Sequence, residues 1–206
     1  MGGFWAVAGA LAVRLVPSSH VPRATVIIFG GVGAANVFSA YTFISPVLRD
    51  VSGIDGRLVG PLLFGFGVAG IAGNFVAGAA VATRLHPTVL SITAVLGVTV
   101  LLYPLAGLTG AGGVVLLVIW GLVYGGVSAS LQTWMIKAAP QAVEEASALW
   151  VAVFNLSIGL GALAGGAVVD ALPLQGILWL AGGLVLAAGP AVWSARRILP
   201  PGPRRH

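Results

Sequence analysis

The longest stretch of the sequence without a charged residue indicates the class of fold. It runs from Pro87 to Ile136 and reads PTVLSITAVLGVTVLLYPLAGLTGAGGVVLLVIWGLVYGGVSASLQTWMI, without a single Asp, Glu, Lys, Arg or His. About 20 apolar helical residues cross the roughly 30 Å hydrocarbon core of a bilayer, so this stretch is too long for one span. The run GLTGAGG at 107–113 is rich in helix breakers and divides it. The stretch therefore predicts a helical hairpin that crosses a membrane twice.

Further charge-free stretches flank this hairpin on both sides, and each is long enough for one span. The expected fold is all-α: a polytopic membrane protein with six transmembrane helices. The predicted spans are 24–48, 58–83, 87–106, 114–136, 146–169 and 173–195. Residues 1–23 are expected to form a partial or interfacial helix and a cytoplasmic loop, because the apolar run that opens them is too short to cross. Residues 196–206 form a basic tail.

The composition excludes the other broad classes of protein. Of 206 residues, 58% are hydrophobic, 31 are Gly and only 7% are charged, whereas a soluble domain has roughly a quarter charged residues. The chain has no Cys, which excludes disulfides, thiolate metal sites and cysteine nucleophiles. No motif indicates a cofactor, a metal site or an enzyme.

Basic residues set the expected orientation. Eight Lys and Arg residues lie on the side of the termini, and only Arg49 and Arg57 lie on the other side. Cytoplasmic loops carry the excess of Lys and Arg, so both termini are expected in the cytoplasm of a multi-pass plasma membrane protein. The formal net charge of +5 therefore indicates orientation in a lipid bilayer, not binding to nucleic acid.

All five acidic residues lie at span ends or in loops. A proton-driven transporter usually places a carboxylate or His at mid-membrane, where burial can shift its pKa. Asp170 is the nearest candidate for such a role, although a residue at a helix end is the more ordinary interpretation.

Uncharged polar residues concentrate in the predicted first, fourth and fifth spans, and each needs a hydrogen-bond partner or a water-filled cavity. Individually they fit interhelical hydrogen bonds. As groups at near-helical spacing they predict a cavity lined by the first and fourth spans, with the aliphatic third and sixth spans facing lipid. The candidate substrate-binding residues are Asn36, Tyr41, Thr42, Tyr124, Ser128, Gln132, Phe154 and Asn155.

Small residues also follow a pattern. Gly121 and Gly125, Gly161 and Gly165, and Gly70 and Gly73 are spaced so that helix backbones can approach closely. Ordinary internal packing is the favoured interpretation, and the alternative is a seam that meets another subunit or another half.

Four stretches carry a family resemblance. LQTWMIKAAP at 131–140 and FNLSIGLGALAGG at 154–166 resemble helices ten and eleven of major facilitator drug and sugar efflux transporters. FSAYTFISP at 38–46 is similar to the seventh helix of that family, and FGFGVAGIAGN at 64–74 to the eighth. The resemblance implies the carboxy-terminal half of a twelve-helix drug:proton antiporter, whose halves are repeats around a midplane site.

The amino-terminal piece resembles a different part of the same family. FWAVAGALAVRLVP at 4–17 is similar to the end of the fourth helix, and the first span begins like a fifth helix before it continues as a seventh. The resemblance therefore implies an internal deletion. It also implies a gating loop at Thr83 and Arg84, where Thr83 stands in place of a frequent Asp.

Two functions remain open from the sequence. The first is half-size efflux of drug-like or sugar-like molecules by alternating access, which requires a homodimer or another transporter half. The second is a truncated or accessory membrane protein without transport activity of its own.

Overall fold

The computed structural model describes residues 44–138 and 172–195, with single positions at 141, 143, 144, 148, 151, 155 and 159. Helix is the only regular secondary structure in this part of the chain, which confirms the all-α prediction. The elements are α3 (Ile44–Pro46), the π-helix η2 (Val47–Val51), α4 (Gly56–Ala106), α5 (Gly110–Ala138), α7 (Leu174–Ala187) and α8 (Gly189–Ala195). The predicted spans 24–48 and 146–169 lie mostly outside the described residues, as do the two terminal segments, so the count of six spans stays a prediction.

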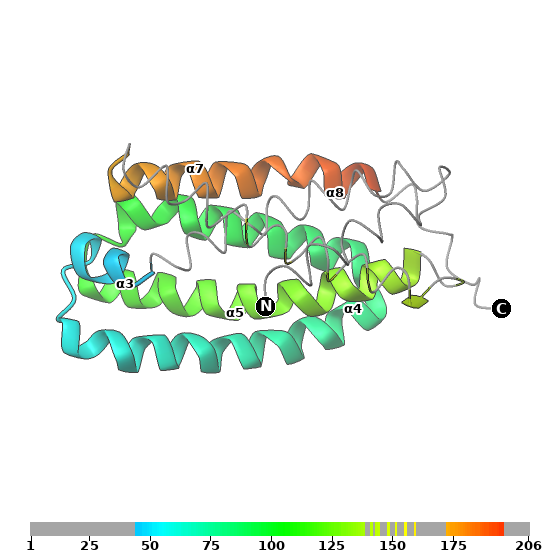
Figure 1. Ribbon diagram of the computed structural model, residues 1–206, viewed down its shortest axis with the longest axis horizontal. Coiled ribbons are helices and arrows are strands. Elements are labelled where there is room, and N and C mark those ends of the chain that lie inside the picture. The colour runs from blue at the N-terminus through cyan, green and yellow to red at the C-terminus, as the bar shows by residue number, and fades with distance from the viewer. Residues whose placement is uncertain are drawn as a thin grey trace.

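Helix α4 is a hairpin of two apolar segments. Its first turn is capped by Asp55, whose side chain accepts a 2.8 Å hydrogen bond from the Arg57 backbone N–H. Arg84 leaves the helical conformation at φ −139° and ψ 66°, and the chain turns back there (Figure 1). Pro87 lies in the first turn after this bend, where its missing N–H costs no helical hydrogen bond. The bend falls at the loop predicted between the second and third spans.

The breaker run at 107–113 separates α4 from α5. The Gly107 N–H donates to the Tyr103 carbonyl at 2.9 Å and closes the last turn of α4. A Cβ at Gly112 would overlap the Ala106 carbonyl, so this tight connection requires glycine there. Two of the described helices, Gly56–Ala106 and Gly110–Trp134, are long and apolar enough to cross a membrane.

Small residues join α4 to α5 by close backbone contact. A Cβ at Gly73 would overlap the Leu122 carbonyl, and a Cβ at Gly125 would overlap the Gly70 carbonyl. Glycine seams of this kind let helices pack without intervening side chains. These seams therefore serve internal packing, as favoured from the sequence, whereas Gly161 and Gly165 lie outside the described residues.

Helix α7 packs on the returning segment of α4. Gly97 lies against the Leu186 side chain, and Gly182 lies against Leu101. Each helix buries one face and exposes the other. On α7, for example, Leu178 is buried and Leu180 is exposed. The aliphatic third and sixth spans are thus only partly available to lipid.

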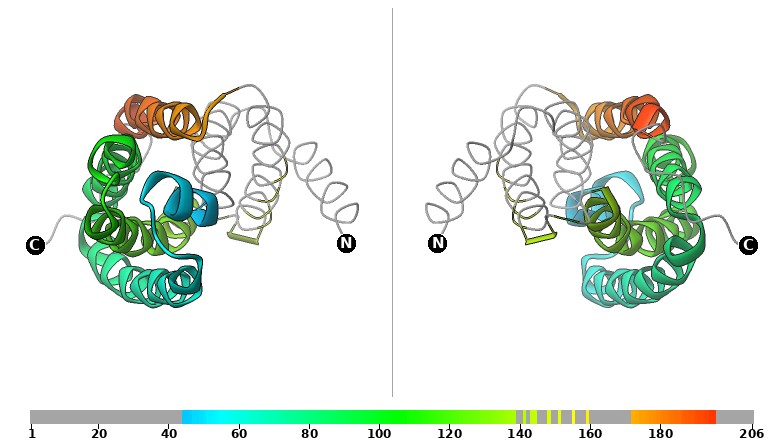
Figure 2. Two further views of the ribbon diagram at one scale, coloured as in Figure 1. Left: turned by 90° about the vertical axis from the view of Figure 1, so that its left-hand side faces the viewer. Right: turned by 90° about the vertical axis from the view of Figure 1, so that its right-hand side faces the viewer.

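These helices form a curved row, and α3 with η2 lies on its concave side (Figure 2). Because the helices lie side by side, their starts, ends and bends fall at two opposite ends along the helix axes. The Gly110 end contains η2 and the starts of α4, α5 and α7, and the Lys137 end contains the bend at Arg84 and the ends of α5 and α8 (Figure 1).

Candidate functional site

The candidate site follows one face of α5. Tyr124, Ser128 and Gln132 are four residues apart and so lie on the same side of the helix. Trp120 and Leu117 continue that face toward the Gly110 end. Burial changes steadily along it: Leu117 and Trp120 are fully buried, Tyr124 is half-buried, and Ser128 and Gln132 are exposed.

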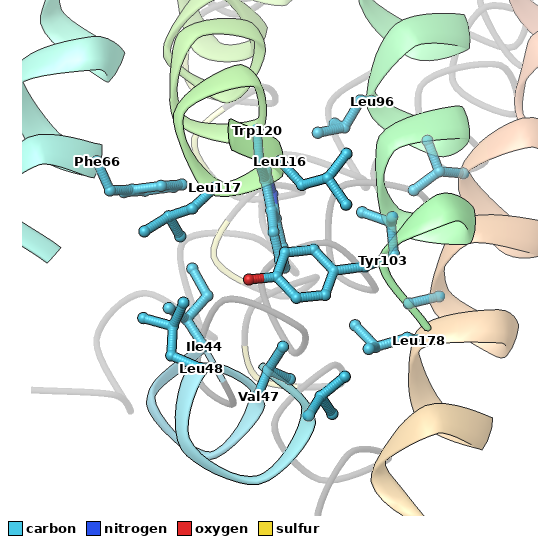
Figure 3. Close-up of a cluster of buried hydrophobic side chains, with 14 of the residues drawn as sticks. Ile44, Val47, Leu48, Phe66, Leu96, Tyr103, Leu116, Leu117, Trp120 and Leu178 are labelled. Carbon is cyan, nitrogen blue, oxygen red and sulfur yellow. The ribbon is translucent and has the colours of Figure 1, made fainter. Parts of the chain in front are cut away.

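A dense apolar cluster closes this face at the Gly110 end (Figure 3). The closing cluster consists of the buried residues Ile44, Leu48, Phe66, Tyr103, Leu117 and Trp120. The Trp120 ring meets Phe66 at 6.3 Å and 86°, and it meets Tyr103 at 6.3 Å and 68°. Edge-to-face pairs of this kind are favourable and directional. Both segments of α4 therefore pack against one tryptophan of α5.

Polar atoms lie within this closure. The Tyr103 hydroxyl donates to the Gly113 carbonyl at 3.1 Å, which fixes the start of α5 against the end of α4. The Trp120 indole N–H is buried and has no acceptor within the described part of the chain. Because a buried unpaired donor is costly, the position of Trp120 is held by packing rather than by hydrogen bonding.

The polar residues nearer the Lys137 end are accessible. Gln132 and Ser128 expose an amide and a hydroxyl, which can both donate and accept hydrogen bonds. The hydroxyl of the neighbouring Thr133 donates to the Ala129 carbonyl at 2.7 Å. Asn155 is exposed and donates to the Val151 carbonyl of its own turn at 2.8 Å.

The gating loop predicted at Thr83 and Arg84 forms the bend of α4. This bend interrupts the helical ladder and leaves carbonyls at the end of the first segment. The Thr83 hydroxyl donates to the Ala80 carbonyl at 3.2 Å, and the Lys137 ammonium donates to the Val81 carbonyl at 3.1 Å. A cation at a helix C-terminus also interacts favourably with the helix dipole. Lys137 therefore ties α5 to the bend.

His86 makes a second tie at the same end. Its Nε2 lies 3.0 Å from the Val192 carbonyl of α8, and because a carbonyl only accepts, Nε2 carries the hydrogen. The imidazole also meets the rings of Trp134 and Trp193 edge-on at 5.9 and 6.2 Å. The bend is thus held to both α5 and α8.

The predicted substrate-binding residues divide into three groups. Tyr124, Ser128 and Gln132 share one face of α5, and Asn155 is described as a single position outside α5. Asn36, Tyr41, Thr42 and Phe154 lie outside the described residues. Sequence reasoning missed Trp120 as part of this face. Its position four residues before Tyr124 was the available signal.

Charge is absent from the middle of the described helices. The described ionisable residues on α4 and α5 are Arg57, Arg84, His86 and Lys137, at helix ends or at the bend. No group of three His, Asp or Glu residues that could hold a metal ion occurs among the described positions. The α5 face therefore offers neutral hydrogen-bonding groups and aromatic surface.

No family model matches the chain. Several of its relatives are named as membrane transporters. An uncharacterized MFS-type transporter of Bacillus subtilis (strain 168) is 32% identical over 157 residues, which are 76% of this chain and 40% of the relative. A probable sugar efflux transporter of Mannheimia succiniciproducens is 29% identical over 158 residues, 76% of this chain and 39% of the relative. The chain thus spans about two fifths of the length of these two relatives.

A longer alignment reaches nearly the whole chain. A purine ribonucleoside efflux pump of Salmonella paratyphi B is 24% identical over 274 residues, covering 97% of this chain and 69% of the pump. The alignment has 274 positions and this chain has only 206 residues, so at least 68 positions of the alignment are gaps in this chain. An alignment longer than the chain requires a gap inside the chain, as the resemblance to separate family helices implies.

The fold has a counterpart among solved structures. A crystal structure of a POT family transporter matches 89% of this chain and 40% of its own chain, with a TM-score of 0.70 and 17% identity. The fold is therefore that of a major facilitator transporter, and the three relatives described above are named as an MFS-type transporter, a sugar efflux transporter and an efflux pump, which are not enzymes.

Proposed function

We propose that this chain is a half-size membrane transporter of the major facilitator type, which exports small neutral molecules across the plasma membrane by alternating access. The observation that carries the proposal is the α5 face. It is sealed at Trp120, half-buried at Tyr124, and exposed at Ser128 and Gln132.

Alternating access requires a site that opens to one side of the membrane at a time. The closing cluster seals the Gly110 end of the α5 face, while Ser128 and Gln132 are accessible toward the Lys137 end. This arrangement corresponds to a state open at the Lys137 end. The opposite state requires the closing cluster to separate and the Lys137 end to close.

The Lys137 end is proposed to face the cytoplasm. Arg84 and Lys137 lie at this end, and the basic terminal segments of the sequence belong to the same side by the count of spans. Substrate would then enter from the cytoplasm along Gln132 and Ser128, which is the direction an exporter needs.

The substrate is proposed to be a neutral, hydrogen-bonding molecule of the drug-like or sugar-like class. The amide of Gln132 and the hydroxyl of Ser128 suit hydroxyl and carbonyl groups, and the half-buried Tyr124, whose ring packs on the buried Phe66, supplies aromatic surface. Among the relatives, one is named for sugar efflux and one for purine ribonucleoside efflux, and both kinds of molecule carry several hydroxyl groups.

A half-size chain needs a second half, because the major facilitator site lies between two repeats. The partner is proposed to be a second copy of this chain or another transporter half. Either would supply the opposite wall of the site.

Binding to purified protein tests this proposal. Labelled inosine and labelled glucose should bind saturably to the detergent-solubilised chain. Gln132→Ala should weaken the binding of the recognised solute about three- to tenfold, because a hydrogen bond contributes about 0.5–1.5 kcal/mol net. Leu102→Ala, on an exposed aliphatic face of α4, is the matched control and should leave binding unchanged. Equal weakening by both variants would place the solute elsewhere.

A further inference from the structure

The closing cluster contains a hydrogen-bond donor without an acceptor. Trp120 is 0% exposed, and its indole Nε1 finds no partner among the residues that the structure describes. Nearly all buried polar groups in folded proteins are paired, because an unpaired one costs free energy. Each exception therefore needs an explanation, and one explanation is a partner that binds in only part of the working cycle.

Filling space does not require this donor. The ring of Tyr103 fills the same cluster, and its hydroxyl is paired with the Gly113 carbonyl at 3.1 Å. A phenylalanine ring in place of the indole would also supply apolar surface, without an unpaired N–H. Trp120 therefore carries a polar group that the closed cluster does not use.

The indole lies at the inner end of the accessible α5 face. Trp120 comes one turn, about 6 Å, before Tyr124 on the same side of the helix. Figure 3 shows the indole extending from α5 toward Tyr103 and the side chains of α3 and η2. A molecule that has passed Gln132 and Ser128 and reached Tyr124 is therefore one helical turn from the indole.

Apolar side chains cover the indole in the state described. Ile44 of α3 and Leu48 of η2 belong to the closing cluster, and neither side chain can accept a hydrogen bond. Alternating access requires this cluster to separate. Separation uncovers Trp120, with its N–H still free, directly beside Tyr124.

We infer that the exported molecule is the missing acceptor, and that the Trp120 indole N–H donates a hydrogen bond to it once the closing cluster separates. The inference rests on the proposed function and assigns Trp120 to the substrate site of the opposite state. Because an indole N–H only donates, the molecule must present an acceptor there, which is an oxygen or an unprotonated ring nitrogen.

This hydrogen bond links binding to the conformational change. A ligand shifts an equilibrium between two states only by binding one of them more tightly. In the state described the N–H is covered and out of reach, whereas in the opposite state it contributes to binding. One such hydrogen bond makes the molecule favour the opposite state about three- to tenfold. The molecule thereby promotes the opening through which it leaves at the Gly110 end.

A buried reporter cysteine tests the inference, since the chain has no native cysteine. Val47 of η2 is 1% exposed, and Val47→Cys changes its volume little. A water-soluble maleimide should label this cysteine only when the closing cluster separates. Saturating inosine or glucose, whichever the native chain binds, should accelerate the labelling. While the closed state predominates, the acceleration equals the ratio of the solute's affinities for the two states.

Trp120 is then replaced site-specifically by 3-benzothienylalanine, which has the shape of tryptophan with sulfur in place of the N–H. The acceleration should fall about three- to tenfold, because the hydrogen bond to the solute is lost. A change in packing alone would alter the labelling rate without solute and leave the acceleration as it was. The same replacement at Trp179, which is exposed on α7, is the matched control and should have no effect.

Two results would overturn the inference. One is a solute that binds to the chain without accelerating the labelling, and the other is an acceleration that the replacement at Trp120 leaves unchanged. A chain that binds neither solute would reject the proposed function, and the inference with it. Failure of the proposed function is therefore distinguishable from failure of the inference alone.

Discussion

Gly73 makes one of the closest helix contacts in the molecule, against the backbone of α5 at Leu122. Gly73→Ala should therefore separate α4 from α5 and lower the free energy of unfolding by about 1–3 kcal/mol, the usual cost of overpacking. Gly67→Ala on the opposite face is the matched control and should not destabilise, because its Cβ meets open space. Thermal unfolding of the two variants in detergent measures this, and equal midpoints would contradict the packing.

Lys137 acts through its hydrogen bond to the Val81 carbonyl. Lys137→Met keeps much of the aliphatic stem and removes the donor, so it should destabilise the Lys137 end by about 1 kcal/mol. Lys137→Arg retains a cationic donor and should lose less. Hydrogen exchange at the amides of 81–86 reports this end directly. Exchange in Lys137→Met as slow as in the native chain would show that the stem, not the hydrogen bond, makes the tie.

Single residues of the site were predictable where polarity made them visible. Tyr124, Ser128 and Gln132 could be assigned to one face because polar groups at a spacing of four are rare in an apolar span. Trp120 lies on the same face but reads as one more apolar residue. Its burial depends on α3 and η2, which lie about 70 residues earlier in the chain, and periodicity within one helix carries no information about them.

Helix α4 should carry the chain from one side of the membrane to the other and back. Reporter fusions at Arg84 and at Gly110 are expected in opposite compartments, with Arg84 in the cytoplasm, because α4 bends at the former and ends just before the latter. A paired phosphatase and fluorescent-protein reporter measures both positions. If the two fusions report the same compartment, the hairpin does not span the membrane.

Helix α5 should differ in access to water along its length. Single cysteines at Ser128 and Gln132 should react with a water-soluble maleimide, whereas cysteine at Leu117 should not, because the closing cluster buries it. Cysteine at Leu102 supplies the decisive control, since Leu102 is exposed but lies on the aliphatic face. Labelling at Gln132 as slow as at Leu102 would mean that the exposed α5 face borders lipid rather than a water-filled cavity.

The boundaries of the helices could be predicted from local sequence, but the packing of one helix on another could not. Arg84, Pro87 and the glycines of 107–113 mark the two bends. A charged residue is disfavoured inside an apolar span, and proline and glycine interrupt a helix. The composition of the third and sixth spans indicated exposure to lipid, yet Leu101 packs on Gly182 and Leu186 packs on Gly97. Apolar side chains suit lipid and protein equally well, so hydropathy alone cannot assign a face.

For the whole molecule, the source of driving force follows from the placement of charge. Transport should not depend on a mid-membrane carboxylate of this chain, because all five acidic residues of the sequence fall at predicted span ends or in predicted loops. In proteoliposomes with an imposed pH gradient, solute should equilibrate in both the native chain and Asp170→Asn, without accumulating. Accumulation that disappears in Asp170→Asn would instead identify Asp170 as the coupling residue.

The most direct test of the account is solute flux by the reconstituted chain. Proteoliposomes loaded with unlabelled inosine or glucose should take up the labelled form of the recognised solute by counterflow, which reports alternating access without any gradient. Gln132→Ala should slow this exchange several-fold while Leu102→Ala should not, because only Gln132 lies on the accessible polar face of α5. Exchange no faster than in protein-free vesicles, from a chain shown to be folded, would contradict transport and favour an accessory role.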